Sequence, residues 1–312
     1  MQELFLHSGV SEVYGKCQEV LLTFLRIEVS GMQVYRVTDT YGKMLEEQKS
    51  EDLPKEEQPL PLKEDEVLYA QVDGTMLLTR TDGWKEVKQG RVFRQSDCLQ
   101  ASKERGWIKQ SHYEAYLGES KVFTKRFEPQ LEAYGPLKNK LVFISDGALW
   151  IRNWIADAYP QSLHILDWYH AVEYLGKFAQ TYFTDKRQRE EWMEHQKTLL
   201  WDSGVDIVLE NISLLPCSAA GTEEAKRELI RYYKANKDHM NYKHFLTIGA
   251  GLIGSGAIEA AHRSLIHKRM KLSGQRWTIQ GAQHLLDLRC AKMSGHWEKV
   301  IQLITKPVTK TA

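Results

Sequence analysis

Two short apolar runs, each followed by an Asp-Gly pair, dominate the pattern of apolar and polar positions along the chain. The first, Glu66 to Asp73, is mostly apolar and is broken by Gly74, which predicts a buried strand that ends in a carboxylate. The second, Lys140 to Ile144, leads into Asp146 and predicts another such strand. Two strands that end in acids predict two carboxylates at one edge of a sheet.

The segments around these runs predict the order of a mixed sheet. Two more strands are expected at 76–80 and 84–94, because Thr81-Asp82-Gly83 between extended runs is a hairpin signal. Helical and strand patterns then alternate, with helices expected at 111–134, 149–158 and 167–181 and a strand at 162–166. Three antiparallel strands followed by this alternation predict a ribonuclease H-like α/β core with a mixed sheet.

A change of pattern after Thr184 predicts an all-helical insertion, with helical spacing at 186–200, 205–214 and 223–237. The glycine-rich segment Gly249 to Gly256 then leads into a predicted helix, Ala257 to Met270, and a further helix is expected at Trp277 to Met293. The chain is expected to have six parts. They are a helical region at 1–48, an acidic proline-containing linker at 49–65, the first part of the core at 66–182, the helical insertion at 183–250, the core helix with a basic C-terminal helix at 251–295, and a tail at 296–312.

The first 48 residues carry two helical patterns on either side of Arg26 to Gly31. Ser30 is placed to cap the second helix. Such a pair resembles a helix-turn-helix, in which Gln33 and Arg36 would lie early on the second helix, where these motifs touch DNA. An ordinary helical hairpin is the alternative, because the second helix also carries acidic residues.

Composition narrows the classes of protein without selecting one. The 312 residues include 42 Lys and Arg against 41 Asp and Glu, a formal net charge of +1, so overall charge gives no argument for a polyanionic partner. The 4 cysteines form no C-x-x-C pair, which argues against a zinc knuckle or a disulfide framework. A reduced, cytoplasmic protein without a membrane partner is expected, since no apolar run approaches the length of a bilayer span.

Three acids form the candidate catalytic and metal-binding group: Asp73, Asp146 and Glu259. The first and fourth strands are neighbours in the predicted order, so the two aspartates can converge, and Glu259 comes from a helix. Mg²⁺ prefers oxygen ligands, and two such ions about 3.5–4 Å apart can activate a nucleophile and stabilise the leaving oxygen at phosphorus. Each acid alone fits an ordinary turn or a solvated helix face. Only their joint placement predicts phosphoryl transfer on nucleic acid.

The segment after Glu259 is basic in a chain that is nearly neutral overall. Between Ala260 and Lys292 the only acid is Asp287, and the basic and histidine residues are Arg263, Lys268, Arg269, Lys271, Arg276, Arg289, Lys292, His262, His267 and His284. Clusters of this kind bind phosphate backbones without reading sequence. A solvated helix face balanced by the acidic linker is the alternative.

Two other positions suit a contact with DNA and also have ordinary structural explanations. Trp277 is suited to stack on an unpaired base at a DNA end, or to anchor the core. Asp167 and His170 are three residues apart in the first turn of a predicted helix. A helix cap followed by a core histidine explains that pair equally well.

Together these segments resemble the bacterial insertion-sequence DDE transposases of the ISKra family, relatives of the Mutator-like transposases. The resemblance extends over most of the chain from Val67 to Ala291, and the combination of segments is specific where each alone is not. The segments are VDGTMLLTRTDGWKEVKQGRVF at 72–93, SDGALWIRNW at 145–154, LDWYHAVEYL at 166–175 and GSGAIEAAHRSLIHKRMKLSGQRW at 254–277. Family members have a longer region before the first aspartate, so the helix pair at 11–47 is expected to be the remainder of a DNA-recognition region.

The resemblance implies a ribonuclease H-like catalytic domain that uses two Mg²⁺ or Mn²⁺ ions, with Asp73, Asp146 and Glu259 as the DDE triad. It implies that Asp167 and His170 form a D-x-x-H element that helps to arrange DNA near the active site, and Trp277 matches a tryptophan that follows the glutamate. The expected function is DNA cleavage and strand transfer at insertion-sequence ends, by a homo-oligomer acting on transposon ends and target DNA.

Two alternatives stay open at this point. The first is a ribonuclease H-like, metal-dependent nuclease that cuts without joining strands, and an assay for joined products in Mg²⁺ separates it from a transposase. The second is a catalytically inactive, transposon-derived DNA-binding protein, which tight binding of uncut DNA without metal dependence would indicate.

Overall fold

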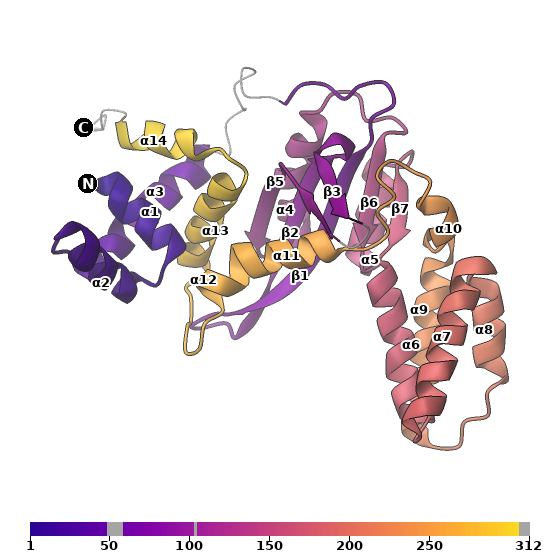
Figure 1. The fold of residues 1–312 in the computed structure, drawn as a ribbon. Coiled ribbons are helices and arrows are strands. Elements are labelled where there is room, and N and C mark those ends of the chain that lie inside the picture. Colours follow the sequence, from indigo (N-terminus) through magenta and orange to yellow (C-terminus); the bar gives the residue numbers. More distant parts are fainter. Residues whose placement is uncertain (49–58, 103–104, 306–312) are drawn as a thin grey trace. The chain divides into compact units, whose positions relative to one another are not determined.

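The fold is a mixed α/β arrangement built on a five-stranded sheet (Figure 1). The computed structural model describes residues 1–48, 59–102 and 105–305. The strand order is β5-β2-β1-β6-β7, with bounds β1 Leu68–Leu78, β2 Trp84–Arg94, β5 His112–Leu117, β6 Leu141–Ser145 and β7 Leu163–Leu166. The predicted mixed α/β class is confirmed. The linker predicted at 49–65 and the tail predicted at 296–312 lie partly outside the described residues.

The chain divides into two compact units, which are described separately. The first unit comprises residues 1–63, 72–137 and 257–312, and the second comprises 64–71 and 138–256. Strand β1 runs through both, since its first four residues belong to the second unit and the remainder to the first.

The other elements of the first unit are α1 Gln2–Ser11, α2 Tyr14–Leu25, α3 Gly31–Gln48, the short η2 Gln95–Asp97, β3 Cys98–Ser102, β4 Arg105–Ile108, α4 Ser120–Glu132, α11 Gly256–His262, the π-helical turn η4 Arg263–His267, α12 Lys268–Met270, α13 Ile279–Met293 and α14 Trp297–Thr305. Those of the second unit are α5 Leu149–Ala158, α6 Trp168–Tyr182, α7 Lys186–Asp202, α8 Val205–Leu214, α9 Ala220–Asn236, the short η3 Lys237–His239 and α10 Tyr242–Phe245.

Strand β1 is longer than the sequence pattern predicts. Asp73 does not end it, and the separate strand expected at 76–80 is its continuation to Leu78. Gly74 interrupts the apolar pattern without interrupting the strand, and the carboxylate of Glu86 in β2 lies where a Cβ at Gly74 would be. The predicted hairpin turn is present directly after β1, where Thr79 N–H donates to the Gly83 carbonyl at 2.8 Å.

The expectation of one helix over 111–134 is wrong in its first part. Residues 112–117 form β5, which is antiparallel to β2 with Val92 opposite His112 and Val87 opposite Leu117. The helix that follows, α4, begins only at Ser120. The aromatic and apolar spacing of this segment fits both periods, and pairing with β2 decides between them.

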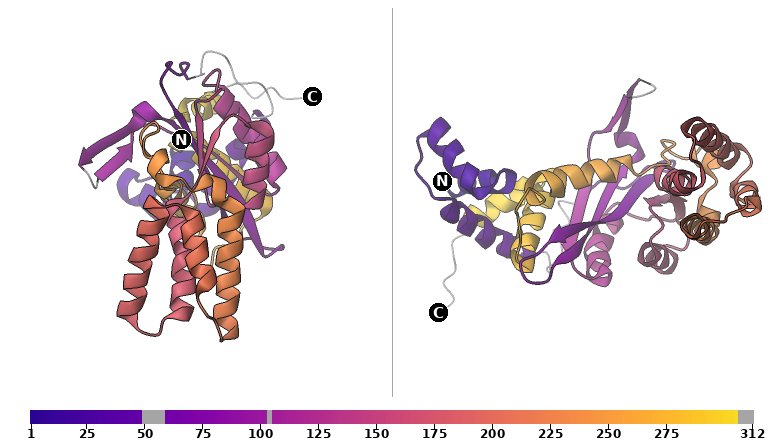
Figure 2. Two further views of the ribbon diagram at one scale, coloured as in Figure 1. Left: turned by 90° about the vertical axis from the view of Figure 1, so that its right-hand side faces the viewer. Right: turned by 90° about the horizontal axis from the view of Figure 1, so that it is seen from below.

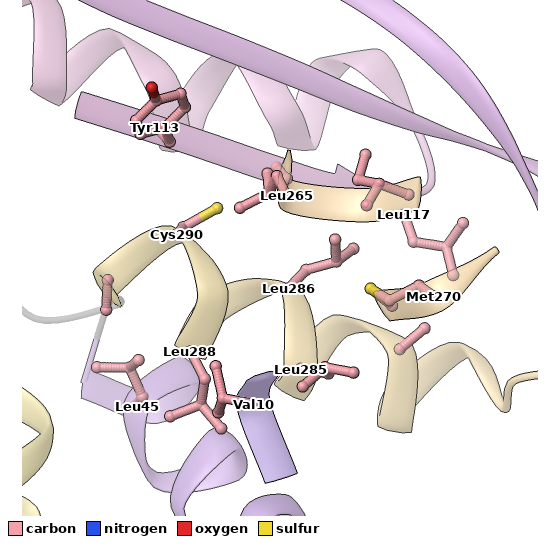
Figure 3. Close-up of a cluster of buried hydrophobic side chains, with 14 of the residues drawn as sticks. Val10, Leu45, Tyr113, Leu117, Leu265, Met270, Leu285, Leu286, Leu288 and Cys290 are labelled. Atoms are coloured by element: carbon pink, nitrogen blue, oxygen red, sulfur yellow. The ribbon is translucent and has the colours of Figure 1, made fainter. Parts of the chain in front are cut away.

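The core of the first unit is organised by α13, which is buried at every position from Gly281 to Ala291. Its apolar side chains pack with those of α1, α3, β5 and the π-helical turn (Figure 3). The buried Gln283 of α13 is also satisfied. It accepts from Leu117 N–H at 2.9 Å and donates to the Ala115 carbonyl at 3.1 Å, which covers backbone groups of the edge strand β5.

The second unit places the strands β6 and β7 beside a helical bundle. The helices expected at 186–200, 205–214 and 223–237 are present as α7, α8 and α9; α7 and α9 pack against α6, and α8 packs against α7 and α9 (Figure 2). Helix α6 begins where predicted, since the Asp167 side chain caps it by accepting from Tyr169 N–H. None of the helices in the described part of the chain combines the length and apolar composition that a membrane span requires.

The N-terminal region forms three helices, one more than the two that the pattern predicts. The predicted cap of α3 is present, because Ser30 Oγ accepts from Gln33 N–H at 3.1 Å. The unpredicted helix α1 packs against α3 through residues such as Leu6 and Val10, which are fully buried in the core that α13 organises. Burial against that core supplies the stability that a helix of 10 residues lacks by itself.

Candidate functional site

The first unit brings Asp73 close to the helix that carries Glu259. Asp73 is half-buried within β1, and its Oδ2 lies 3.7 Å from Nε2 of His262. Glu259 is exposed on α11, three residues before His262, so the two side chains lie on one side of that helix. One predicted acid therefore lies next to a histidine from the predicted basic segment.

His262 carries a ring nitrogen without a hydrogen-bond partner. The side chain is 6 % exposed, and its Nε2 makes no hydrogen bond in the described structure. Burial, followed by the charges of His267 and Lys271, lowers the pKa of His262 to about 4. A neutral imidazole beside a carboxylate presents one nitrogen and one oxygen, both of them types of atom that bind divalent cations.

The π-helical turn after His262 sets the spacing of this face. Its geometry places His267, five residues on, beside His262, with ring centroids 6.3 Å apart and planes at 90°. His267 Nε2 lies 3.3 Å from Thr75 Oγ1, to which Lys271 also donates at 3.3 Å. The turn thus directs a row of basic side chains at residues 73–75 of β1. Such turns recur at functional sites, and the sequence pattern contains no sign of this one.

Arg91 of β2 fixes the start of the helix that carries Glu259. This largely buried guanidinium donates to the Ala257 carbonyl at 2.7 Å and to Ser111 Oγ at 2.9 Å. Since α11 begins at Gly256, this contact holds its first turn against the sheet of the first unit. An arginine within a strand pattern does not indicate such a role, so Arg91 was not among the predicted site residues.

The second unit places Asp146 and Asp167 at the same edge of its sheet. Strands β6 and β7 are parallel, with Ser145 opposite Leu166, so the residues that follow each strand are neighbours. Asp167 N–H donates to the Ser145 carbonyl at 2.8 Å. Asp146 is half-buried, and its Oδ1 accepts from Ala148 N–H at 2.9 Å.

Asp167 is fully buried, and both of its oxygens accept backbone hydrogen bonds. Oδ1 accepts from Tyr169 N–H at 2.6 Å and Oδ2 accepts from Ser255 N–H at 2.9 Å. Burial raises the pKa of Asp167, an effect that the charge of His170 and the backbone donors partly offset. Asp167 therefore ties the glycine-rich segment before α11 to the end of β7.

Two more contacts hold the same segment within the second unit. Trp168 N–H donates to the Ile253 carbonyl at 3.0 Å, and Gln71 Nε2 donates to the Gly254 carbonyl at 3.2 Å. Gly254 leaves no room for a side chain, since a Cβ there would lie 2.6 Å from the Tyr169 ring. The backbone that precedes Glu259 is thus fixed by residues of β1 and of the start of α6.

Tyr232 of α9 supports Asp146 from the helical insertion. Its hydroxyl donates to the Asp146 carbonyl at 2.7 Å, and its ring stacks on Tyr174 with centroids 3.8 Å apart. Burial, followed by the charge of Asp146, raises the pKa of Tyr232 well above its usual range, so the hydroxyl stays a donor. Tyr232 was not among the predicted residues, because nothing in a helical pattern indicates which tyrosine reaches the sheet.

The predicted DNA-binding residues fall into exposed and buried groups. The exposed ones are Arg263, Lys268, Lys271 and Arg276 of the basic segment, and Gln33 and Arg36 of α3. Arg269 is 1 % exposed and Trp277 is 8 % exposed, and Trp277 Nε1 donates to the Met270 carbonyl at 2.9 Å within the core. His170 is half-buried, with Nδ1 3.6 Å from Glu173. The roles of all these residues toward DNA stay predictions.

The predicted triad is distributed over both units. Asp73 and Glu259 belong to the first and Asp146 to the second, together with Asp167 and His170. Convergence of the three acids stays a prediction. No protein-family model matches the chain, and a comparison with curated proteins finds no significant match.

Proposed function

We propose that the chain is a DDE transposase with a ribonuclease H-like core, in which Asp73, Asp146 and Glu259 carry metal-dependent cleavage and strand transfer on DNA. The observation that carries the proposal is the strand order β5-β2-β1-β6-β7. It makes β1, with Asp73, the neighbour of β6, after which Asp146 follows. A core of this order, with one acid on its central strand and another directly after the neighbouring strand, is the arrangement that the proposed chemistry needs.

The surroundings of each acid support a role as a ligand. Asp73 lies beside a neutral, unpartnered imidazole nitrogen, and Asp146 is only partly buried, with Oδ1 accepting from the nearby Ala148 N–H. Glu259 is exposed on the helix that begins next to the segment held by Asp167. Divalent ions bound by these carboxylates would supply charge stabilisation at the phosphoryl oxygens and ease deprotonation of the attacking oxygen.

Other residues of the candidate site hold the backbone around the acids in place. Asp167 and Gln71 fix the backbone that leads to Glu259, Arg91 fixes the first turn of its helix, and Tyr232 holds the backbone of Asp146. Rigid support of this kind keeps reacting groups in a productive geometry, which is worth several kcal/mol in catalysis. Lys271 and the exposed basic residues of the same segment would contact phosphates.

A strand-transfer assay tests the proposal. The purified chain is incubated in Mg²⁺ with a supercoiled target plasmid and a duplex that carries the DNA flanking this reading frame. We expect cut and joined products, and reductions on the order of 10³-fold or more for Asp73→Asn, Asp146→Asn and Glu259→Gln, because several kcal/mol of charge stabilisation is removed. Asp157→Asn, an exposed acid on α5, is the matched control and should keep full activity.

Each other outcome selects an alternative. Cut DNA without joined products would replace the transposase by a nuclease. Tight binding of DNA that is never cut, with or without metal, would leave a DNA-binding protein. A triad variant that still joins strands would remove that acid from the mechanism.

A further inference from the structure

The first unit contains a cavity of about 480 Å³ between the helix pair α2–α3 and the segment that runs from α12 to the start of α13. Three arginines, three aromatic residues and the first turn of α3 line it. The residues that matter here are Arg80, Arg269, Arg276, Tyr14, Tyr35 and Trp277. Among the described residues its lining includes no aspartate or glutamate, so the wall is positively charged without a counter-charge of its own.

Arg269 is the most buried charge at this cavity. It is 1 % exposed, its Nε donates to the Gly9 carbonyl at 3.1 Å, and its two terminal nitrogens have no hydrogen-bond partner in the described structure. The guanidinium lies over the Tyr14 ring at 4.6 Å and the Trp277 ring at 5.4 Å. Burying a guanidinium whose terminal donors are unsatisfied is costly, so an anion in the cavity would reduce the cost of keeping Arg269 charged.

Arg289 of α13 shows what a fully satisfied arginine looks like in the same core. It is 9 % exposed, and its three guanidinium nitrogens donate to the carbonyls of Val10, Ser264 and Leu265. The backbone therefore uses every nitrogen of the Arg289 guanidinium, whereas the two terminal nitrogens of Arg269, a residue of the cavity lining, are buried without a hydrogen-bond acceptor in the described structure.

Other features of the wall favour an anion. Arg80 and Arg276 are exposed at the cavity, and Arg80 N–H donates to the Trp277 carbonyl at 2.8 Å, which fixes the two segments side by side. The first turn of α3, a helix of 18 residues, adds the positive end of its dipole. The nearby acid Asp39 is engaged with His284 Nδ1 at 2.8 Å.

We propose that this cavity is a phosphate-binding site for a nucleic acid strand, with Arg80 and Arg276 as the direct contacts and Arg269 as the fixed charge behind them. Planar guanidinium groups suit phosphate oxygens, and the aromatic rings suit the adjoining sugar and base. The exposed Gln33 and Arg36 on α3 extend the same surface toward a duplex. The assignment to nucleic acid rests on the proposed function, whereas the binding of phosphate does not.

Titration calorimetry with inorganic phosphate tests the site without DNA or metal. The full chain should bind phosphate, and the double variant Arg80→Ala/Arg276→Ala should bind it about 10-fold more weakly or worse, since two charge-assisted hydrogen-bonding groups are removed. Lys121→Ala/Lys125→Ala is the matched control, because these two lysines are exposed on α4 and do not line the cavity. Absence of phosphate binding, or equal weakening in both double variants, overturns the proposal.

Duplex binding at several salt concentrations tests the source of the phosphate. The slope of log K against log salt should fall by about 0.9 for each phosphate that Arg80→Ala/Arg276→Ala no longer neutralises. Duplexes with and without 5′-phosphates separate a terminal phosphate from an internal one. An unchanged slope overturns the nucleic acid assignment. If the triad variants keep full activity while the arginine double variant changes the salt dependence, the proposed catalysis is overturned and the phosphate site is retained.

Discussion

Asp146 and Asp167 follow neighbouring parallel strands at the same edge of the second unit, yet their surroundings differ. Asp146 is half-buried, and one of its oxygens accepts from the nearby Ala148 N–H. Asp167 is fully buried, and its two oxygens accept from Tyr169 and Ser255. The end of a parallel strand therefore does not by itself define the role of an acid. The two carboxylates differ in how far backbone donors occupy them, since both oxygens of Asp167 and only Oδ1 of Asp146 accept from N–H groups in the described structure.

The largest expected effect is a loss of folding stability at low pH, caused by His164 of β7. This histidine contacts Ser145 of β6 and so joins the two strands that precede the two acids. Ser145 Oγ and His164 Nε2 lie 2.9 Å apart, and burial, with the charges of His239 and Arg152, lowers the pKa of His164 to about 3. The folded state thus favours neutral His164, and this stability is complete above the unfolded pKa of about 6.5 and is lost as the pH falls toward 3. Urea unfolding should show a decrease on the order of a few kcal/mol over that interval.

His164→Gln should flatten this acid-dependent decrease in stability, because the titrating group is gone and a polar side chain remains beside Ser145. The exposed His195→Gln variant is the control and should keep the wild-type pH profile. Identical profiles for His164→Gln and the wild type would show that another group is responsible.

The next-largest expected effect is a difference in folding stability between variants of Asp167 and Asp146. Asp167→Asn replaces one accepting oxygen with an amide that cannot accept from Ser255 or Tyr169 N–H, so the free energy of unfolding should fall by about 1–3 kcal/mol. Asp146→Asn should leave stability within about 0.5 kcal/mol, because it retains an acceptor for Ala148. Denaturant unfolding of both variants measures the difference. Equal decreases would mean that the two acids have the same structural role.

The smallest effect tests the support of Asp146 by the helical insertion. Tyr232→Phe removes the hydrogen bond to the Asp146 carbonyl and should cost about 1 kcal/mol of stability. Tyr233→Phe is the matched control, since its hydroxyl donates to the Ala171 carbonyl at 2.8 Å and not to Asp146. If Tyr232 positions Asp146, only its variant should also lower strand-transfer activity. Equal activity in both would limit Tyr232 to a structural role.

Local patterns predicted most of the second unit correctly. The strand before Asp146, helix α5, the cap at Asp167 and the helices of the insertion all appear close to the expected residues. These elements have strong helical periodicity, caps or compact apolar runs, which depend on neighbours along the chain. The same local reasoning failed at β5, where a segment with ambiguous spacing becomes a strand by pairing with β2.

Local sequence patterns likewise identified only some residues of the candidate site. The acids Asp73, Asp146 and Glu259 were identifiable because each stands at a recognisable change of pattern. Three supporting contacts were not: His262 as the neighbour of Asp73, Tyr232 as the support of Asp146, and Arg91 as the anchor of α11. Each of these contacts joins residues that are far apart along the chain, so only packing reveals it.

The amino-acid pattern by itself determined the mixed α/β class, most helices and the acids worth testing, because apolar period, capping and glycine placement act over a few residues. The tertiary structure decided which side chains keep unused donor or acceptor atoms. Arg269 and Arg289 have the same side chain in one basic stretch, but backbone carbonyls accept from all three guanidinium nitrogens of Arg289, whereas the two terminal nitrogens of Arg269 have no acceptor in the described structure. The physical reason is that hydrogen-bond satisfaction in a core depends on the elements that pack around a residue.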